Sequence, residues 1–559
     1  MRLPTEARRP ISRAGPGRIR GIAAIAALVF AACGPSAASP TAPLATSTPG
    51  SGTPAATAAT GPTGTLTIAL ADSPQSLDPL QAWNSYTDII SLGTYDALVQ
   101  YGAGSPAELQ PWLAEKWSAS SDGMEYTFTL RSGVVFHDGS SLTAADVKYT
   151  LDRVKRLNSG VAYEIPAYDS SEVVGDLEIK VRLSAPYAPF VAGLSRIYIL
   201  NSKLLQANEG TDDGQSWLAL NEAGSGPYAL ESYTAGDSTV LKAYPGYWRG
   251  WDGSHVQTVV LKVMRESATQ LLALQGGDAQ VALDIAKADL DGLKSGGEFT
   301  VNTTDTLLQF YVAFNTKSKG PTGDVRFREA LSWAYDYRSH IEQVLGGYAA
   351  GAQGPLPKAI PCHKDDVTQP TFDLQKAREL LVAAGYDPST ITLKMAFDPS
   401  IEEHRKSLEL FQSSLRDIGI TVDAAPLQFT PYVETLRSYD TTLDLASIYE
   451  FSDFPDPHAV LYPHFGSAFL LGNGGYNWSQ YSNPRVDELL DQGVGLSDLT
   501  ARCPIYDEVQ EIIANDYPVI NISNGGLFAV VVTGPTVAGY KYNLAHHRTV
   551  NYYDMTVSQ

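Results

Sequence analysis

The sequence predicts an α/β fold, a mixture of helices and strands divided into more than one lobe. The chain has 559 residues, too many for one small core and enough for two or three domains of ordinary size. From Thr65 onward, stretches with a period of two residues interleave with stretches of helical period, without a strict alternating order. No short segment repeats along the chain, which excludes a solenoid or a propeller.

Four stretches alternate apolar and polar residues in the way that half-buried strands do. Apolar side chains occupy every second position at 66–70, 124–130, 177–183 and 391–397. A period of two places these side chains on one face of a sheet. Each of the four stretches is therefore predicted to be a strand.

Helix signals lie between and after these strands. The stretch Thr143–Asp146 resembles a capping box, and helical periodicity over 327–345 predicts one amphipathic helix. Another helix is predicted within 373–385, where an Asp begins it and a Gly ends it. Pro484 and Pro504 are predicted at the first positions of two further helices, because Pro is tolerated there.

The N-terminal region reads as a secretion signal followed by a tether. Residues 1–32 contain six Arg and an uninterrupted apolar run too short to span a bilayer, which is typical of a signal peptide. The run ends in Phe30–Cys33, which resembles a lipobox with Phe where Leu is usual, so Cys33 is predicted to carry a lipid. The alternative is ordinary cleavage after the small residues that precede Cys33. The rest of 33–63 is almost entirely Ala, Ser, Thr, Pro and Gly, and predicts a disordered tether.

Charge and cysteine content narrow the classes of partner and site. The net charge is −21, and it becomes −26 without residues 1–32, so the surface repels phosphate backbones and we expect no nucleic-acid binding. No Cys-x-x-Cys pair is present, which argues against a zinc ribbon or a thioredoxin-like site. In an exported protein Cys362 and Cys503 could form a disulfide, or they could be two buried free thiols.

No motif for catalysis or for a cofactor is present. The chain lacks a nucleophile elbow, a dinucleotide fingerprint, a phosphate loop and a zinc-binding His-Glu-x-x-His helix. The pairs His458 with His464 and His546 with His547 could bind a metal, but no accompanying ligand spacing favours this over polar loop residues. We therefore expect no enzyme, no cofactor and no metal site.

The stretch from Leu443 to Pro457 contains the main candidate for a binding residue. Its first half is strand-like, and its second half is a turn interrupted by prolines, which lack the backbone donor that a ladder needs. Asp453 therefore lies where a strand ends, a usual position for ligand-contacting groups. Surrounded by Tyr449, Phe451 and Phe454, its carboxylate is a candidate receptor for a cation. The alternative is an Asp that caps a turn.

Several stretches, in order along the chain, resemble the landmarks of one protein family. They cover essentially residues 64–559, and together they resemble the peptide and nickel class of extracellular solute-binding proteins of ABC importers. The stretches are Leu109–Val147, Gly224–Tyr228 with Tyr247–Trp248, Asp324–Leu331 with Tyr335–Asp336, Ala377–Tyr386, Tyr481–Leu490 and Asp516–Pro518.

The resemblance implies a two-lobed periplasmic-binding-protein-like fold with an extra subdomain in the first lobe. Mapped by its landmarks, lobe one would comprise residues 64–310, lobe two 311–524, and residues 525–559 would return to lobe one. The implied function is capture of extended peptides between closing lobes and delivery to a membrane permease. The implied protein is a monomer, extracytoplasmic in the periplasmic space and anchored to the cell membrane by its lipid.

The resemblance also assigns roles to individual residues. Asp453 would pair with the free ammonium of a peptide, and the strand Tyr449–Phe451 would hydrogen-bond its main chain. From lobe one, Trp83 and Tyr86 would form apolar walls, or would pack between the lobes. The alternative ligands are a metal chelate, a sugar or an opine; more remote alternatives are a secreted hydrolase and a receptor without transport.

Overall fold

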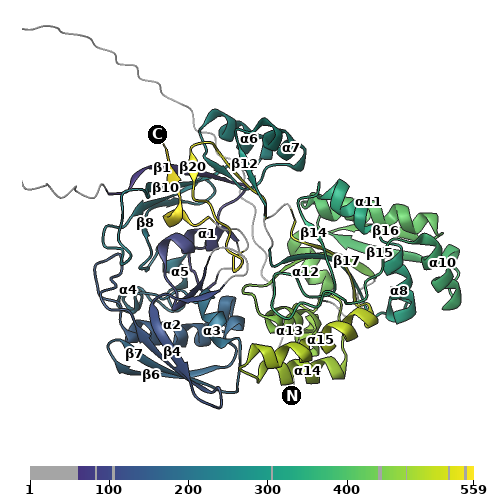
Figure 1. The fold of residues 1–559 in the computed structure, drawn as a ribbon, viewed down its shortest axis with the longest axis horizontal. Coiled ribbons are helices and arrows are strands. Elements are labelled where there is room, and N and C mark those ends of the chain that lie inside the picture. The colour runs from purple at the N-terminus through teal and green to yellow at the C-terminus, as the bar shows by residue number, and fades with distance from the viewer. Residues whose placement is uncertain are drawn as a thin grey trace, which may run out of the picture. The chain divides into compact units, whose positions relative to one another are not determined.

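The computed structural model describes residues 61–81, 85–102, 108–303, 306–437, 443–473, 475–526, 529–546 and 550–558, apart from the side chains at 429 and 430. One unit covers residues 59–559. The described strands of this unit form two large sheets, a four-stranded sheet and two short ribbons. In Figure 1 the two large sheets mark two lobes, which we call the first and second lobe in the order in which the chain enters them.

The first lobe is built on a seven-stranded mixed sheet. Its strand β1 lies parallel to β10 and β11, and the predicted alternation of Leu66, Ile68 and Leu70 places these side chains in the core. The late strand β19 pairs with β11 and β12, so the chain returns to this lobe near its C-terminus. Across the sheet the order is β12 (Thr300–Asn302), β19 (Val531–Thr533), β11 (Val281–Ala282), β1 (Thr63–Leu70), β10 (Val256–Val263), β9 (Ser238–Ala243) and β8 (Tyr228–Thr234). The helices of this part are α1 (Ser85–Thr94), α6 (Ser267–Gly276), α7 (Lys287–Gly296) and the 3-10 turn η9 (Tyr552–Asp554), with the ribbon β20 (Val537–Ala538) and β21 (Thr556–Val557).

A four-stranded antiparallel sheet forms an additional subdomain of the first lobe. The helix α2 (Ala144–Leu157) contacts its strands β6 and β7, and the predicted capping box is confirmed because the Thr143 N–H donates to Asp146 at 2.8 Å. In order, the strands are β4 (Ala114–Ala119), β5 (Glu125–Leu130), β7 (Glu178–Leu183) and β6 (Tyr168–Gly175). Around them lie the ribbon β2 (Val99–Tyr101) and β3 (Leu109–Pro111), the helices α3 (Phe190–Gly193), α4 (Ser202–Ala207) and α5 (Gln215–Leu218), and the 3-10 turns η1 (Gly160–Glu164) and η2 (Leu194–Arg196).

The second lobe is built on a six-stranded sheet with helices on both faces. Its central strands β13 and β17 are antiparallel. The side chains of these two strands divide between two apolar cores, one against each face of the sheet. The strand order is β14 (Ala350–Gly351), β18 (Val519–Asn524), β13 (Leu308–Phe314), β17 (Leu445–Phe451), β15 (Thr392–Phe397) and β16 (Thr421–Pro426). The helices are α8 (Val325–Trp333), α9 (Tyr337–Ser339), α10 (Leu374–Ala383), α11 (Glu402–Asp417), α12 (Phe429–Leu436), α13 (Pro457–Phe465), α14 (Pro484–Val494) and α15 (Leu499–Asp516), with the π-helical turn η4 (His340–Val344) and the 3-10 turns η3 (Pro321–Gly323), η5 (Pro388–Thr390), η6 (Ser467–Phe469) and η7 (Leu471–Asn473).

Two helix predictions were wrong in detail. The single helix predicted over 327–345 is broken after α8, because Asp336 caps a new turn by accepting from the Ser339 N–H at 2.9 Å. Pro504 does not begin a helix; it lies inside α15, whose first turn is capped earlier by Asp498. The helix thereby lacks one backbone hydrogen bond, since Pro has no N–H to donate.

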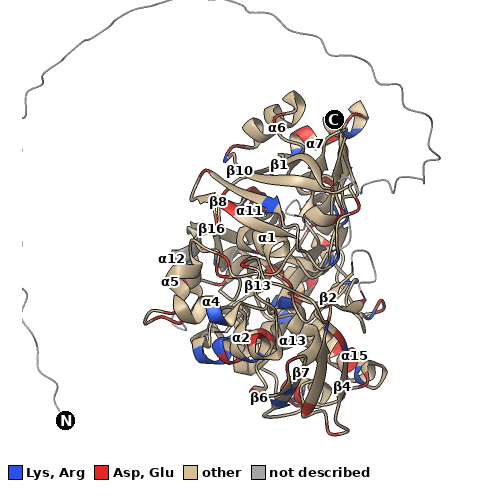
Figure 2. Ribbon diagram, turned by 90° about the vertical axis from the view of Figure 1, so that its left-hand side faces the viewer, with Lys and Arg blue, Asp and Glu red and all other residues tan. Residues whose placement is uncertain are grey.

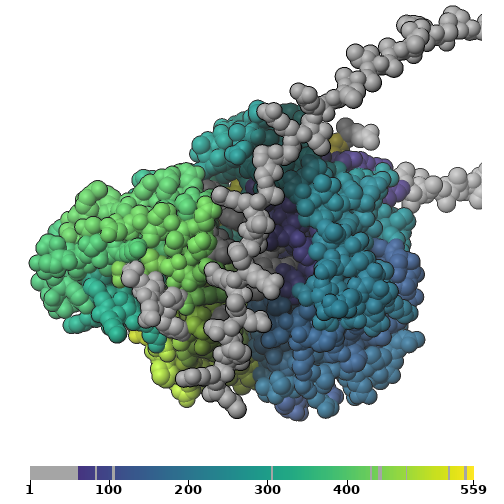
Figure 3. All heavy atoms as spheres, turned by 180° about the vertical axis from the view of Figure 1, so that it is seen from behind, coloured from purple at the N-terminus to yellow at the C-terminus, as the bar shows by residue number. Residues whose placement is uncertain are grey.

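Covalent and polar links hold distant segments of the body together. Cys362 and Cys503 form a disulfide with Cα atoms 4.9 Å apart, which settles the alternative left open by the sequence. Figure 2 colours Lys and Arg positions along α2 in blue, and Lys148, Lys155 and Arg156 of this helix each form an ion pair with a carboxylate. In Figure 3 the first lobe is mostly purple to teal, and the second lobe is mostly green. Among the described helices, none is both long and apolar enough to cross a bilayer.

Candidate functional site

The strand β17 has one edge that is only partly paired. Along its whole length it pairs with β13, whereas on the other side the parallel strand β15 reaches only Leu445 and Ala446. Among the described strands none pairs with β17 on that side beyond Ala446, and the Ser447 carbonyl there accepts from the Tyr432 hydroxyl. Among the described strands, β13 is therefore the one that pairs with β17 from Ser447 to Phe451.

The turn after β17 carries two carboxylates with different surroundings. Asp456 is the cap of α13, accepting from the His458 N–H at 2.8 Å, and both its oxygens receive hydrogen bonds from Arg502 at 2.7 and 2.8 Å. Both of these residues belong to the second lobe and are buried. The role of turn cap, considered for Asp453, thus belongs to Asp456.

Asp453 instead faces residues of the first lobe. The Tyr163 hydroxyl donates a short hydrogen bond to one of its oxygens, and the Arg196 Nη2 lies 3.7 Å from the other. Its side chain is 12% exposed. A carboxylate that is mostly withdrawn from water is stabilised by ionic and hydrogen-bonding partners, and Tyr163 and Arg196 of the opposite lobe are two such partners of Asp453.

Arg196 connects this carboxylate to the interior of the first lobe. Its Nη1 donates to both oxygens of Asp88 at 3.1 Å and to the Ala545 carbonyl at 3.1 Å, and it contacts the ring of His546. His546 in turn lies 2.8 Å from Asp88. One guanidinium thus lies between a carboxylate of its own lobe and one of the other lobe.

Glu164, the last residue of η1, is the third carboxyl group at this position. It is only 3% exposed, and it lies near enough to Asp453 of the other lobe for the two charges to interact. Burial, and then the charge of Asp453, raises the pKa of Glu164 well above its ordinary value, while Arg196 opposes the shift. Its Oε1 is buried with no hydrogen-bond partner among the described residues.

The lobes are in apolar contact beside this polar cluster. Phe454, which follows Asp453, is buried against Tyr101 of the first lobe and Ala545 of the C-terminal segment. The ring of Tyr187 lies 6.0 Å from that of His458, and the Ala188 N–H donates to the Val494 carbonyl at 2.9 Å. The described conformation therefore has Asp453 at a contact between the lobes.

The other predicted site residues lie in different surroundings. Tyr449 stacks on His404 and packs against Phe310 inside the second lobe. Phe451 is half-buried at the end of β17, and Tyr86 is half-buried on α1, packed against the core of the first lobe. Trp83, Cys33 and His547 lie outside the described residues.

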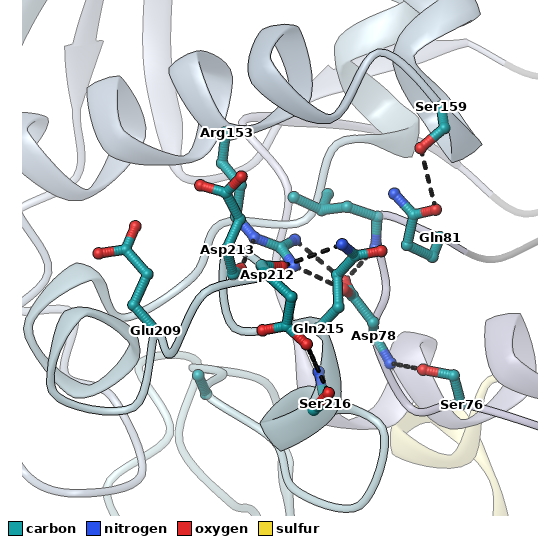
Figure 4. Close-up of polar contacts among 12 residues, drawn as sticks. Ser76, Asp78, Gln81, Arg153, Ser159, Glu209, Asp212, Asp213, Gln215 and Ser216 are labelled. Carbon is teal, nitrogen blue, oxygen red and sulfur yellow. Dashed lines mark hydrogen bonds and ion pairs between the residues drawn. The ribbon is translucent and has the colours of Figure 1, made fainter. Parts of the chain in front are cut away.

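The loop that carries Trp83 and Tyr86, predicted to contact the ligand from the first lobe, is held in place at its start. Arg153 of α2 donates to both oxygens of Asp78 at 3.1 and 2.6 Å, and both side chains are almost fully buried (Figure 4). The Leu80 N–H donates to the same carboxylate, and Ser159 bonds Gln81. A buried, doubly bonded ion pair of this kind fixes the direction in which the loop leaves β1.

Sequence reasoning missed the residues of the first lobe that meet Asp453. Tyr163, Glu164 and Arg196 belong to the short turns η1 and η2, which have no hydrophobic period and match no motif. A weak signal was present, since a Tyr-Glu pair and an Arg in otherwise apolar stretches need partners when buried. The sequence could not name these partners, because the partner Asp453 lies more than 250 residues further along the chain.

His458 and His464 lie in the second lobe, whereas His546, which contacts Arg196 and Asp88, also lines a cavity in the first lobe. His458 stacks on Tyr462, and His464 lies 3.2 Å from Glu450; among the described residues no three potential ligands converge on a metal position.

A cavity in the first lobe is lined by Asp96, Trp112, Arg249 and others, and the residues that line it do not include those of β17. Burial raises the pKa of Asp96 to about 6 against the hydrogen bonds that it accepts from Trp112, Ser225 and Trp248.

Comparison with known proteins decides the family. The model of the bacterial extracellular solute-binding proteins, family 5 (middle region), matches residues 108–469. The chain belongs to this family. A probable D,D-dipeptide-binding periplasmic protein of Escherichia coli is 30% identical over 81% of this chain and 86% of its own length, and a heme-binding protein A of Haemophilus influenzae is 28% identical over 80% and 84%.

Solved structures agree on the fold. The periplasmic binding protein DppA of Helicobacter pylori, in complex with the peptide STSA, has a TM-score of 0.77 at 24% identity, covering 89% of this chain and 99% of that one. The substrate-binding protein CtaP of Listeria monocytogenes has a TM-score of 0.79 at 23% identity, covering 89% and 100%. The predicted two-lobed fold is thus confirmed, and the members of the family are binding proteins of transporters.

Proposed function

We propose that this protein captures peptides with a free amino terminus between its lobes and delivers them to the permease of an ABC importer. The observation that carries the proposal is Asp453, a carboxylate at the end of β17 whose partners include Tyr163 and Arg196 of the opposite lobe. The relatives support it, since they include a probable D,D-dipeptide-binding protein and a dipeptide-binding protein, both of Escherichia coli.

The chemistry follows from the two parts of the site. In this proposal the backbone of Tyr449–Phe451 in β17 supplies donors and acceptors to the peptide main chain, and such bonds are indifferent to the side chains of the peptide. Asp453 supplies the charge that an enclosed ammonium needs once it has lost its water. In this proposal Tyr449 supports the strand from inside its lobe, Phe451 contacts the ligand, and Trp83 and Tyr86 complete the wall from the first lobe.

The same proposal places the protein outside the cytoplasm. Residues 1–32 would be removed as a signal peptide, Cys33 would carry the lipid, and 33–63 would tether a monomeric body to the membrane. Lobe one would comprise 64–310 and the returning segment 525–559, and lobe two 311–524. Metabolic labelling with a fatty-acid analogue, compared between the wild type and Cys33→Ser, tests the anchor.

The experiment that tests the function is mass spectrometry of small molecules released from protein purified without denaturation. Peptides with unmodified amino termini are expected, and their uptake should fail in cells that lack the protein. Release of a heme, a metal chelate, a sugar or an opine in place of peptides would contradict the peptide assignment and leave the family unchanged. Peptides cleaved on incubation with the purified protein would instead identify a hydrolase.

A further inference from the structure

A second polar contact joins the lobes on the side of α7. Tyr348 lies between η4 and β14 of the second lobe, and its half-buried ring packs against the apolar cluster that α6, α7 and β19 form in the first lobe. The Tyr348 hydroxyl donates to an oxygen of Asp291 on α7 at 2.7 Å. One turn earlier on α7, the Lys287 ammonium donates to the Gln343 carbonyl of η4. A ring, a hydroxyl and an ammonium therefore hold this segment of the second lobe to one helix of the first.

Gly346 allows α7 to approach this segment closely. Its φ is +64°, in the left-handed region that favours glycine, and a Cβ at this position would lie 2.5 Å from the Cε of Lys287. Any other residue here would have to push the lysine side chain away. The backbone before Tyr348 thus fits the surface of α7.

The same segment lies beside the places where the chain crosses between the lobes. The chain passes from β12 of the first lobe to β13 of the second, and returns from β18 to β19. Ala350 of β14 pairs with Asn524 at the end of β18, and the Gly525 N–H donates to the Leu308 carbonyl at the start of β13 at 2.7 Å. Tyr348 is two residues from Ala350, and α7 contacts β12. The contact between Tyr348 and α7 therefore lies next to the crossings.

The contact between Ala188 and Val494 lies at another place between the lobes. Val494 ends α14, which is far from α7 and β12 in Figure 1. When one lobe rotates about an axis near the crossings, its atoms move in proportion to their distance from that axis. Contacts beside the crossings move least, and those at α14 move more.

Two crossing strands by themselves allow the lobes to twist as well as to close. A third attachment beside the strands restricts the twist and leaves closure possible, because it lies near the axis of closure. The contact of Tyr348 with α7 has the position that such an attachment needs.

We propose that Tyr348 and Asp291 form a pivot that stays in contact while the lobes open and close. The inference goes beyond the proposed function, because it concerns the lobes and holds whichever ligand closes them. Tyr348 is then a positioning residue. By restricting twist it brings Asp453 of the second lobe to the same partners, Tyr163 and Arg196, at each closure.

The test measures the separation of the lobes by single-molecule fluorescence energy transfer in the full-length protein without peptide. One dye is attached to each lobe through a genetically encoded keto amino acid, at the exposed positions Glu172 of β6 and Glu379 of α10. Cys33→Ser is present in every protein, so that a thiol-reactive linker reacts with introduced cysteines.

Two chemical links are compared in this protein. A short bismaleimide joins Asp291→Cys to Tyr348→Cys in one variant, across the proposed pivot. In the other variant it joins Ala188→Cys to Val494→Cys, across the contact at α14. We expect the link at the pivot to leave the distribution of distances unchanged, and the link at α14 to remove the open population.

Variants of Tyr348 test whether it guides closure. Tyr348→Ala should widen the distribution of distances and should bind a synthetic mixture of tripeptides with free amino termini up to about tenfold more weakly. Tyr348→Phe keeps the ring and should have a smaller effect in the same direction. The matched control is Tyr386→Ala, a half-buried tyrosine whose hydroxyl donates to Asp324 of its own lobe at 3.2 Å. It should leave the distribution unchanged and the affinity within about twofold of the wild type.

The outcomes distinguish the pivot from the function. Loss of the open population on linking the pivot, or a distribution for Tyr348→Ala as narrow as that of the wild type, overturns the pivot. A link at α14 that leaves the distribution unchanged also overturns it, because the lobes would then not separate there. If Tyr348→Ala does not fold, the linked proteins and Tyr348→Phe decide. Failure of the wild type to bind the tripeptides overturns the proposed function instead, and the distances measured without peptide still decide the pivot.

Discussion

Asp453 and Asp456 are three residues apart on one turn, and the structure gives them opposite surroundings. Asp456 is enclosed within its own lobe, where Arg502 satisfies both of its oxygens and α13 uses it as a cap. Asp453 faces outward, and Tyr163 and Arg196 of the other lobe contact it. Two carboxylates in nearly the same local sequence therefore differ in role because they contact different residues. Asp456 is structural, whereas Asp453 can bind a ligand.

The largest effect on stability is expected at Asp456, which is enclosed within the second lobe. Asp456→Asn keeps a residue that caps helices well but leaves the buried Arg502 without its anion, so the free energy of unfolding should fall by roughly 3 to 5 kcal/mol. Chemical denaturation measures this, with Asp491→Asn, an exposed residue of α14, as the control. A loss below about 1 kcal/mol would mean that the pair is no more than a surface ion pair.

The disulfide should also stabilise the surroundings of Asp456, because Cys503 follows Arg502 on α15. It closes a loop with a sequence separation of 141 residues, so its removal should lower the free energy of unfolding by about 2 to 5 kcal/mol through the greater entropy of the unfolded chain. Denaturation of the double variant Cys362→Ser with Cys503→Ser measures the change. Peptide affinity of the folded double variant should stay within about twofold of the wild type; a larger loss would connect the disulfide to the site.

Acid should lower the stability of the second lobe through its buried histidines. Burial, and then the charge of Arg502, lowers the pKa of His458 to about 3, and burial lowers that of His404 to about 4. Below the unfolded value of about 6.5 the unfolded chain binds protons that the buried histidines do not, so the free energy of unfolding falls by about 1.4 kcal/mol per pH unit for each histidine until the pH reaches its folded value. Thermal unfolding between about pH 7 and pH 4 tests the slope. His458→Gln should reduce it, and an unchanged slope would exclude this histidine.

The smallest effect is expected from the hydroxyl of Tyr163. Tyr163→Phe removes one hydrogen bond between the lobes without changing the ring, so contact between the lobes should weaken by about 1 kcal/mol while the stability of each lobe is unaffected. Fluorescence energy transfer between one dye on each lobe measures closure in the absence of peptide. If the distribution of distances is the same in both proteins, the hydroxyl makes no net contribution to closure.

Much of the fold could be predicted because its causes are local. The alternating residues of β1, β5, β7 and β15, the box at Thr143 and the Pro that begins α14 each determine their own element. The errors came where two local signals competed, as at Pro504, where the earlier cap at Asp498 prevails. The position of Asp453 at a strand end was also a local inference, and it is correct.

The partners of Asp453 could not be predicted in the same way. Tyr163 and Glu164 lie on a short 3-10 turn of the first lobe, and Arg196 on another, so no periodicity relates them to the turn after β17. The surroundings of Asp456 were equally hidden, since Arg502 lies on a helix that begins more than 40 residues later. A sequence specifies which residues end a strand, whereas long-range packing specifies what they meet.

The central claim is that Asp453 binds the ammonium of the ligand, and a two-by-two comparison tests it most directly. Calorimetry would measure the free energy with which the wild type and Asp453→Asn bind one peptide, chosen because it is released from the purified protein. The peptide would be used with a free and with an acetylated amino terminus. The account predicts that acetylation costs the wild type roughly 2 to 5 kcal/mol of binding free energy and costs Asp453→Asn much less. Equal costs in the two proteins would contradict it, because the ammonium would then be bound elsewhere.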